Sequence, residues 1–342
     1  MQIKEYNPTS TIAIARFMGI TQESSDLRDM IYNLCQQILK TLGRDEPIPT
    51  DFAEILKFCN NLLNDIPPSL NLVLLLDSLN SLLPDFNAHQ LHWLPRKLPP
   101  NVKIIVSCLP HAHGMFTRIK TEIIKENHDN FLEMHPLGGD RAMSMLLHWL
   151  QKENMSVTND QADLLRAAFQ KCSLPLYLKM VFHEVKQWRS FDSVEEKCLG
   201  TNCETFLELL FDKLEKNHGP ITVKHSIAYL TASKTGLSDM EMEDMLSLDE
   251  RVLTEINSRS NVGMVIRRCP PSVWAKVRND IEPFLQLKVA DDVDINFWVH
   301  NVIRNYTEKR YLGDPEFVRD THHMIADYYL GVWHGKPMKY TD

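Results

Sequence analysis

The sequence predicts an α/β domain with an incomplete parallel sheet, followed by an all-α domain and a winged-helix domain. Strand-like and helix-like patterns alternate through the first third of the chain. The segment from Asp140 to Leu214 contains helix-like patterns alone, and the segment after it combines three short helices with a β-hairpin. These observations divide the 342 residues into four parts, 1–137, 138–217, 218–312 and 313–342.

The α/β part is expected to consist of short apolar strands and amphipathic helices. Ser25 is the expected cap of a first helix and Gly43 its expected end, and a second helix is expected to begin near Thr50 or Asp51. The segment Leu72–Leu76 is apolar at every position, which predicts a central parallel strand covered on both faces. The predicted strands are Thr11–Phe17, Leu72–Leu76, Val102–Val106 and a shorter one at Phe131–Met134.

The later parts carry helical signals. The expected helices are Ala142–Leu150, Gln161–Phe169, Leu174–Trp188, Thr205–Leu214, Val223–Leu230, a helix from Ser238, Pro270–Ile281, His300–Leu312 and Pro315–Trp333. A capping box of Ser238 and Glu241 opens the second helix of the winged-helix part. Two strand-like runs flank Ala290-Asp291-Asp292 and predict a hairpin.

Composition and charge narrow the possible functions. With 37 Lys and Arg against 45 Asp and Glu, the net charge is −8, so a broad basic surface for nucleic acid is not expected. No apolar run approaches the roughly 18–20 residues of a membrane span, and no span is expected. The 7 cysteines are scattered without a CxxC pair, which predicts reduced thiols in a cytoplasmic protein rather than zinc ligands.

The strongest chemical signal is an apolar strand that ends in an acid, Leu72-Val73-Leu74-Leu75-Leu76-Asp77. This is the Walker B layout of P-loop NTPases, where the carboxylate holds the water shell of Mg²⁺ at the strand's carboxyl end. The alternative is that Asp77 only caps the following turn. Phosphates also need a glycine-rich loop with a lysine, and the sequence contains no GxxxxGK[ST] motif. We therefore expect a P-loop NTPase-like sheet without its principal phosphate-binding wall.

Three further residues are candidates, and each has a structural alternative. Ser107 follows the strand Val102–Val106, where a hydroxyl can sense a terminal phosphate or simply end the strand. His300 follows the predicted hairpin and could donate to a phosphate, although a histidine there more often packs within its own domain. Pro175 lies at a helix start, where pre-organisation of the helix is a sufficient explanation.

The winged-helix part does not carry the cations of a DNA-reading face. In its third predicted helix Lys276 and Arg278 are balanced by Asp280 and Glu282. Its second predicted helix carries the acids Asp239, Glu241, Glu243 and Asp244. Because phosphate contacts dominate DNA affinity, protein partners, including self-association, are preferred over nucleic acid.

Several motifs in a fixed order resemble those of the NACHT and WD-repeat domain proteins, which are signal-transduction ATPases with numerous domains. The resemblance extends over nearly the whole chain. The segments that carry it are RFMGIT (16–21), Ser24-Ser25, LVLLLDSLN (72–80), KIIVS (103–107), CSLPLYLK (172–179), HGPITVKHSIAYLTASKTGLSDMEMEDML (218–246), FWVHNVIRNYTEKRYL (297–312) and HMIADYYLG (323–331).

The resemblance implies a NACHT domain, a helical domain and a winged helix that close over ADP and open with ATP and Mg²⁺. It implies that Asp77 is the Mg²⁺-associated acid and Ser107 the sensor. It also implies that Pro175 lies near the base and that His300 faces the β-phosphate. Asn80 departs from the family pattern, because many members have a second acid there, and this weakens activation of water.

Two functions of different classes follow. In terms of the family, residues 1–137 are a NACHT-like core without the Walker A segment, and residues 313–342 lead to a WD-repeat region absent from this sequence. The chain is then an internal fragment, a truncated isoform or an incomplete gene model. It is expected to act as an interaction scaffold that binds no nucleotide. The alternative is an ATP/ADP switch that hydrolyses ATP when an upstream P-loop is present, and a DNA-binding regulator ranks third.

Overall fold

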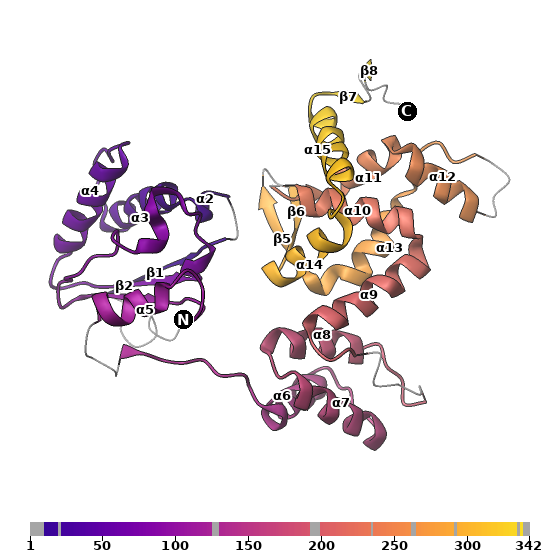
Figure 1. The fold of residues 1–342 in the computed structure, drawn as a ribbon, viewed down its shortest axis with the longest axis horizontal. Helices are drawn as coiled ribbons and strands as arrows, with labels where there is room; N and C mark the ends of the chain where they lie inside the picture. The colour runs from indigo at the N-terminus through magenta and orange to yellow at the C-terminus, as the bar shows by residue number, and fades with distance from the viewer. Residues whose placement is uncertain are drawn as a thin grey trace. The chain divides into compact units, whose positions relative to one another are not determined.

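The protein forms two compact units, residues 1–133 and 134–342, in a computed structural model (Figure 1). The structure describes residues 10–19, 22–124, 130–191, 199–233, 235–260, 265–290, 293–333 and 336–337. None of the helices in these ranges is both long and apolar enough to cross a bilayer. Each unit is described below by itself.

Unit 1 (residues 1–133) contains the predicted parallel sheet, in the order β1-β2-β3. Its elements are β1 (Thr11–Phe17), α2 (Gln22–Ser25), α3 (Leu27–Leu42), α4 (Phe52–Asn64), β2 (Asn71–Asp77), η1 (Leu79–Ser81), η2 (Asp85–Gln90), β3 (Val102–Val106), α5 (Met115–Arg118) and η3 (Ile119–Ile123). Three of the four predicted strands are therefore confirmed. The fourth prediction was wrong, because Phe131–Met134 forms no strand and two of its apolar side chains, Leu132 and Met134, are mostly exposed.

The two faces of this sheet differ in burial. Ile14, Leu74 and Ile104 are paired across the three strands, and this row packs into the core that includes residues of α3 and α4. The next row, Ala15, Leu75 and Ile105, points to the opposite face, where Ile105 is 52% exposed. On β2 itself, Val73 and Leu75 of this opposite face are only partly buried, so the expected full cover of both faces is not seen among the described residues.

Local capping sets the ends of the two long helices of unit 1. The side chain of Asp26, rather than the expected Ser25, caps α3 by accepting a hydrogen bond from Asp29 N. Gly43 ends α3 as predicted, with a φ of 66° that favours glycine. Asp51 caps α4, also as predicted.

Unit 2 (residues 134–342) is built on one continuous apolar core from α6 to α14. Its elements are α6 (Gly139–Lys152), α7 (Asn159–Lys171), α8 (Pro175–Val185), α9 (Cys203–His218), α10 (Pro220–Ala232), β4 (Leu237–Ser238), α11 (Asp239–Leu248), α12 (Glu250–Arg259), α13 (Pro271–Ile281), η6 (Glu282–Phe284), β5 (Leu285–Ala290), β6 (Val293–Trp298), α14 (Asn301–Tyr311), α15 (Pro315–Tyr329), β7 (Val332–Trp333) and β8 (Lys336–Pro337). It includes both the helical and the winged-helix segments, whose further division at 217/218 and 312/313 stays a prediction.

The winged helix consists of α10, α11 and α13 with a three-stranded sheet in the order β4-β6-β5. The predicted hairpin is confirmed, since β5 and β6 pair antiparallel. The capping box of Ser238 and Glu241 is also present. The helix α12, between α11 and α13, was not predicted.

Two buried carboxylates hold α10 in place through hydrogen bonds. Asp249 caps α12, accepts a hydrogen bond from the Tyr229 hydroxyl at 2.7 Å and lies 2.5 Å from the His225 ring nitrogen. Glu255 accepts hydrogen bonds from the first turn of α10, at 2.6 Å from the amide of Thr222. Buried carboxylates need such donors, because an unpaired charge in the core is costly.

The helix α15 is attached to α10 and α11 through tyrosine hydroxyls. The Tyr229 hydroxyl of α10 lies 3.3 Å from the Met324 sulfur of α15. From α15, Tyr328 and Tyr329 donate to the α11 carboxylates of Asp244 and Glu241, at 3.4 and 2.9 Å. The helix ends at Tyr329 rather than at the predicted Trp333.

Candidate functional site

The carboxyl edge of the sheet in unit 1 brings three of the predicted residues together. Asp77 is the last residue of β2 and is exposed, and Ser107 follows β3 on the neighbouring strand. The Ser107 hydroxyl donates to Asp77 Oδ1 at 2.5 Å, and Ser78 Oγ donates to Asp77 Oδ2 at 3.3 Å. The carboxylate is therefore fixed at the edge, with part of its acceptor capacity used by hydroxyl groups.

The turn after Asp77 is held in an uncommon backbone conformation. Ser78 has a φ of 62°, which is unusual for a residue other than glycine, asparagine or aspartate. Its amide donates to Ser107 Oγ at 2.8 Å, and the next amide, of Leu79, donates to the Ser107 carbonyl at 2.9 Å. Ser107 thus accepts hydrogen bonds from the amides of this turn and donates one to the carboxylate of Asp77. The position of Ser107 at the end of its strand was predicted, whereas the role of Ser78 was not.

Asn80 lies at the same edge but acts on the loop after β3. Its Oδ1 accepts a hydrogen bond from the amide of Leu109 at 3.0 Å. A carboxamide has no basic group at neutral pH, so it cannot take a proton from water as a carboxylate can. In this geometry Asn80 holds the two loops of the edge together.

A magnesium ion would find oxygen donors at this edge but not a complete site. The donor set, the Asp77 carboxylate with the hydroxyls of Ser78 and Ser107, has the hard oxygen chemistry that Mg²⁺ prefers. Across the described ranges, no group of three or more His, Cys, Asp or Glu side chains could hold a metal ion. These residues could therefore contact a Mg²⁺ ion through one water molecule, if the phosphates of a nucleotide supplied its other ligands.

The other two predicted residues, Pro175 and His300, lie in unit 2. Pro175 is the first residue of α8 and is exposed, which agrees with pre-organisation of the helix start. His300 caps α14, and its Nδ1 accepts a hydrogen bond from the amide of Val302 at 3.1 Å. That bond uses one ring nitrogen as an acceptor. The phosphate-contacting role of His300 stays a prediction.

One residue near His300 was missed by the sequence interpretation. Partial burial and then the positive charge of Lys179 lower the pKa of the His300 imidazole. Lys179 lies on α8, one helical turn after Pro175, and is exposed. The spacing of four residues was a usable signal, because it places the two side chains on one face of α8. The proximity to His300 depends on tertiary packing.

Comparisons with a family model and with curated proteins relate this chain to the same group of proteins. Residues 198–319 match the family model of the NWD1-like winged helix-turn-helix domain. NACHT and WD repeat domain-containing protein 2 of Homo sapiens is 32% identical over 325 residues, which cover 95% of this chain and 18% of that protein. NACHT domain- and WD repeat-containing protein 1 of Homo sapiens is 28% identical over 94% of this chain and 21% of that protein.

The chain spans about a fifth of the length of these curated relatives. Among solved structures, the Aeropyrum pernix ORC1 protein in complex with DNA matches with 9% identity and a TM-score of 0.35, over 89% of this chain and 78% of that one. A likeness of that size carries no argument. The motifs, the winged-helix match and the two alignments, which cover nearly all of this chain, agree with one another: this chain is a member of the NACHT and WD-repeat domain protein family.

Proposed function

We propose that this chain is a regulatory module of a NACHT-type nucleotide switch, and that these 342 residues alone act as a protein-interaction scaffold. The observation that carries the proposal is the hydrogen-bonded pair of Asp77 and Ser107 at the carboxyl edge of the sheet. The sequence contains this pair but no GxxxxGK[ST] motif to bind phosphates. Ligands of open α/β sheets bind at this edge. The chain therefore holds the Mg²⁺-facing side of a nucleotide site.

The missing phosphate loop decides the affinity. Charge-assisted hydrogen bonds from such a loop contribute roughly 1.5–3 kcal/mol each. The loss of two or three, about 3–9 kcal/mol, would weaken a micromolar site by at least about a hundredfold, to a dissociation constant of about 100 μM or weaker. The Asp77 carboxylate does not compensate, because it repels phosphate unless Mg²⁺ lies between them.

Two features support protein contact as the function of the isolated chain. On α13, Arg278 forms an ion pair with Asp239 of α11, which neutralises a cation that a nucleic-acid-binding face would need. In unit 1, the sheet face opposite the α3 and α4 core carries Phe17 and Ile105, each more than half exposed among the described residues. Parallel sheets are normally covered on both faces, so this apolar surface favours contact with protein.

Isothermal titration calorimetry with ADP and with ATP, each with Mg²⁺, tests the scaffold proposal. We expect no binding tighter than about 100 μM. Tighter binding by the wild-type chain that is lost in Asp77→Ala and retained in Asp163→Ala, an exposed control in unit 2, would contradict it. That result would favour the alternative, a nucleotide-binding switch that hydrolyses ATP once a P-loop is supplied in a longer protein.

A further inference from the structure

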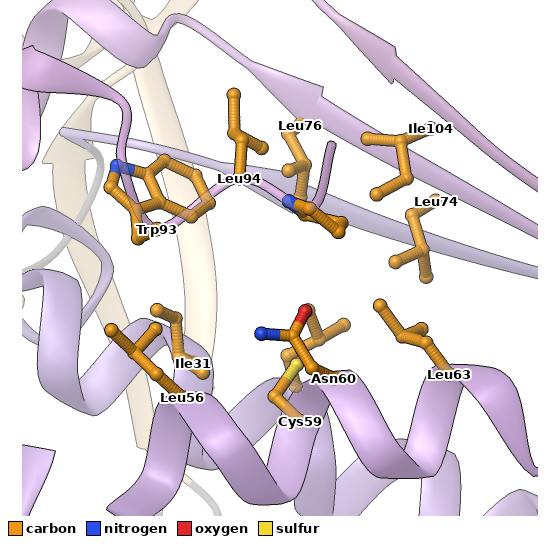
Figure 2. A pocket seen from close by; sticks show the side chains of 12 residues that line it. Ile31, Leu56, Cys59, Asn60, Leu63, Leu74, Leu76, Trp93, Leu94 and Ile104 are labelled. Carbon is orange, nitrogen blue, oxygen red and sulfur yellow. The ribbon is translucent and has the colours of Figure 1, made fainter. Parts of the chain in front are cut away.

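A small pocket in unit 1 has no room for a partner. It lies between α4 and the sheet, with Cys59 and Leu63 of the helix on one side and Leu74 and Leu76 of β2 on the other (Figure 2). Its volume is about 20 Å³, and a single water needs about 10–15 Å³. The pocket therefore admits no ligand larger than a water molecule.

The winged-helix sheet of unit 2, in contrast, ends in a strand with exposed apolar side chains. In the order β4-β6-β5, the strand β5 pairs with β6 on one side, and no strand in the described ranges pairs with its other side. Leu287 is 59% exposed and Val289 is 65% exposed. An open strand edge is a template for pairing with another chain, and native proteins usually keep such edges short, charged or covered. The apolar edge of β5 therefore indicates a place where another strand binds.

The hydrogen bonds of the hairpin decide which residues of β5 face this open edge. The amide of Val299 donates to the carbonyl of Phe284 at 2.9 Å, in register with the β5–β6 pairs. Because hydrogen-bonded pairs alternate along an antiparallel ladder, the backbone groups of Gln286 and Lys288 point to β6. The residues whose N–H and C=O groups point away from β6 are the odd-numbered ones, Leu285, Leu287 and Val289. The outward backbone groups thus belong to the apolar residues of the strand.

We propose that β5 pairs antiparallel with β5 of a second copy of this chain, about a two-fold axis at Leu287. This inference names one partner for the protein-contact role proposed above, and it rests on that role. In this register Leu287 lies opposite Leu287 of the partner subunit, and Leu285 lies opposite the partner subunit's Val289. Every outward residue then belongs to a hydrogen-bonded pair, and each such pair exchanges two hydrogen bonds. The two sheets join into one, in the order β4-β6-β5-β5-β6-β4.

Charge and hydrogen bonding both favour an axis at Leu287 over its neighbours. An axis at Lys288 would place two ammonium groups directly opposite one another, which is destabilising. An axis at Gln286 would place Val289 opposite Pro283, which has no N–H to donate. With the axis at Leu287, the Lys288 ammonium lies opposite Gln286 of the partner subunit, whose amide oxygen can accept a hydrogen bond. The edge is therefore complementary to itself, and this favours a second copy over an unrelated strand.

The same pairing covers the exposed apolar side chains. Side chains directly opposite in an antiparallel pair lie on one face of the sheet, so Leu287 contacts its own copy and Val289 contacts Leu285. Gln286 and Lys288, both exposed, lie on the other face. One pair of short strands buries less than the about 1,200 Å² of a standard stable interface, so the dimer is weak and reversible.

Sedimentation velocity of the full chain, over about 1–200 μM, tests the proposal. We expect a reversible dimer with a dissociation constant of about 10–100 μM. Growth stops at the dimer, because a two-fold contact between identical edges is closed. A chain that is monomeric at about 200 μM, or that forms species larger than a dimer, would overturn the proposal. Neither result alters the calorimetric test of the scaffold, since that test measures nucleotide binding at Asp77 of unit 1.

A matched pair of substitutions locates the contact. Leu287→Lys places two introduced charges opposite one another at the axis and should weaken the dimer at least about tenfold. The control is Leu330→Lys, the same change at a residue of α15 that is 75% exposed, and it should leave the dissociation constant unchanged. Equal effects of the two substitutions would show that the contact lies elsewhere. Circular dichroism establishes that each variant is folded.

Two substitutions at one exposed position test the register. Gln286→Glu places a carboxylate opposite Lys288 of the partner subunit and should tighten the dimer at least about twofold. Gln286→Lys places an ammonium group there and should weaken it by a similar factor. Changes of the same sign in both variants would refute the axis at Leu287.

Discussion

Replacement of Asp249 by alanine tests the view that a buried carboxylate holds the winged helix together. Asp249 is 1% exposed and caps α12, and it is bonded to the side chains of His225 and Tyr229. The cap is worth about 1 kcal/mol, and each of two buried groups left unpaired costs about 1–3 kcal/mol. Asp249→Ala is therefore expected to reduce the free energy of unfolding by roughly 3–7 kcal/mol. This range includes the loss of about 3–5 kcal/mol that is typical when one partner of a buried ion pair is removed.

Urea unfolding followed by tryptophan fluorescence measures this loss, because all tryptophans except Trp93 lie in unit 2. The control is Asp163→Ala, which removes an ion pair with Arg166 whose side chains are 74% and 55% exposed. Such a pair contributes at most about 1 kcal/mol. A loss below about 1 kcal/mol for Asp249→Ala, equal to the control, would refute the assignment of a stabilising role to the network.

Three further predictions concern unit 2. A Cβ added at Gly219 would lie 2.4 Å from Glu255 Oε2, and the φ of 103° is unfavourable for other residues. We expect Gly219→Ala to reduce the free energy of unfolding by about 2 kcal/mol and so to lower the thermal midpoint by several degrees. An unchanged midpoint would contradict this. Lys179→Ala should raise the pKa of His300, since the lysine charge lowers it, and an imidazole NMR titration measures the shift; a pKa that stays constant would exclude the contact. Burial raises the pKa of Asp249, but the hydrogen bond and charge of His225 lower it by more, to below 3.8. The stability from this ionisation is present above pH 3.8 and is lost as the pH falls through the folded-state pKa, so the urea midpoints of wild type and Asp249→Asn should converge in that window; a constant difference would argue against it.

Local sequence signals predicted most of the elements. The strand Thr11–Phe17, the helix end at Gly43 and the capping box at Ser238 depend on neighbouring residues, and each is confirmed. The strand expected at Phe131–Met134 was wrong, because four residues of mixed pattern do not fix a structure without a neighbouring strand to pair with. The helix α12 was missed because most of its residues are polar and few apolar positions mark its buried side.

The sites were predictable only in part. Asp77 and Ser107 could be placed together, because parallel strands bring their carboxyl ends to one edge of a sheet. The contact of His225 with Asp249, and the effect of Lys179 on His300, join residues that are far apart in the chain. Their polar side chains gave no signal of burial or proximity, because both arise from how the helices pack.

The tyrosine contacts of α15 have a mechanical consequence. Met324, Tyr328 and Tyr329 attach the helix at points spread over its second half, so it cannot swivel about a single anchor. We therefore expect a displacement of the carboxyl end of α15 to be accompanied by movement of α10 and α11. The helix α15 and the winged helix are then expected to move together as one body.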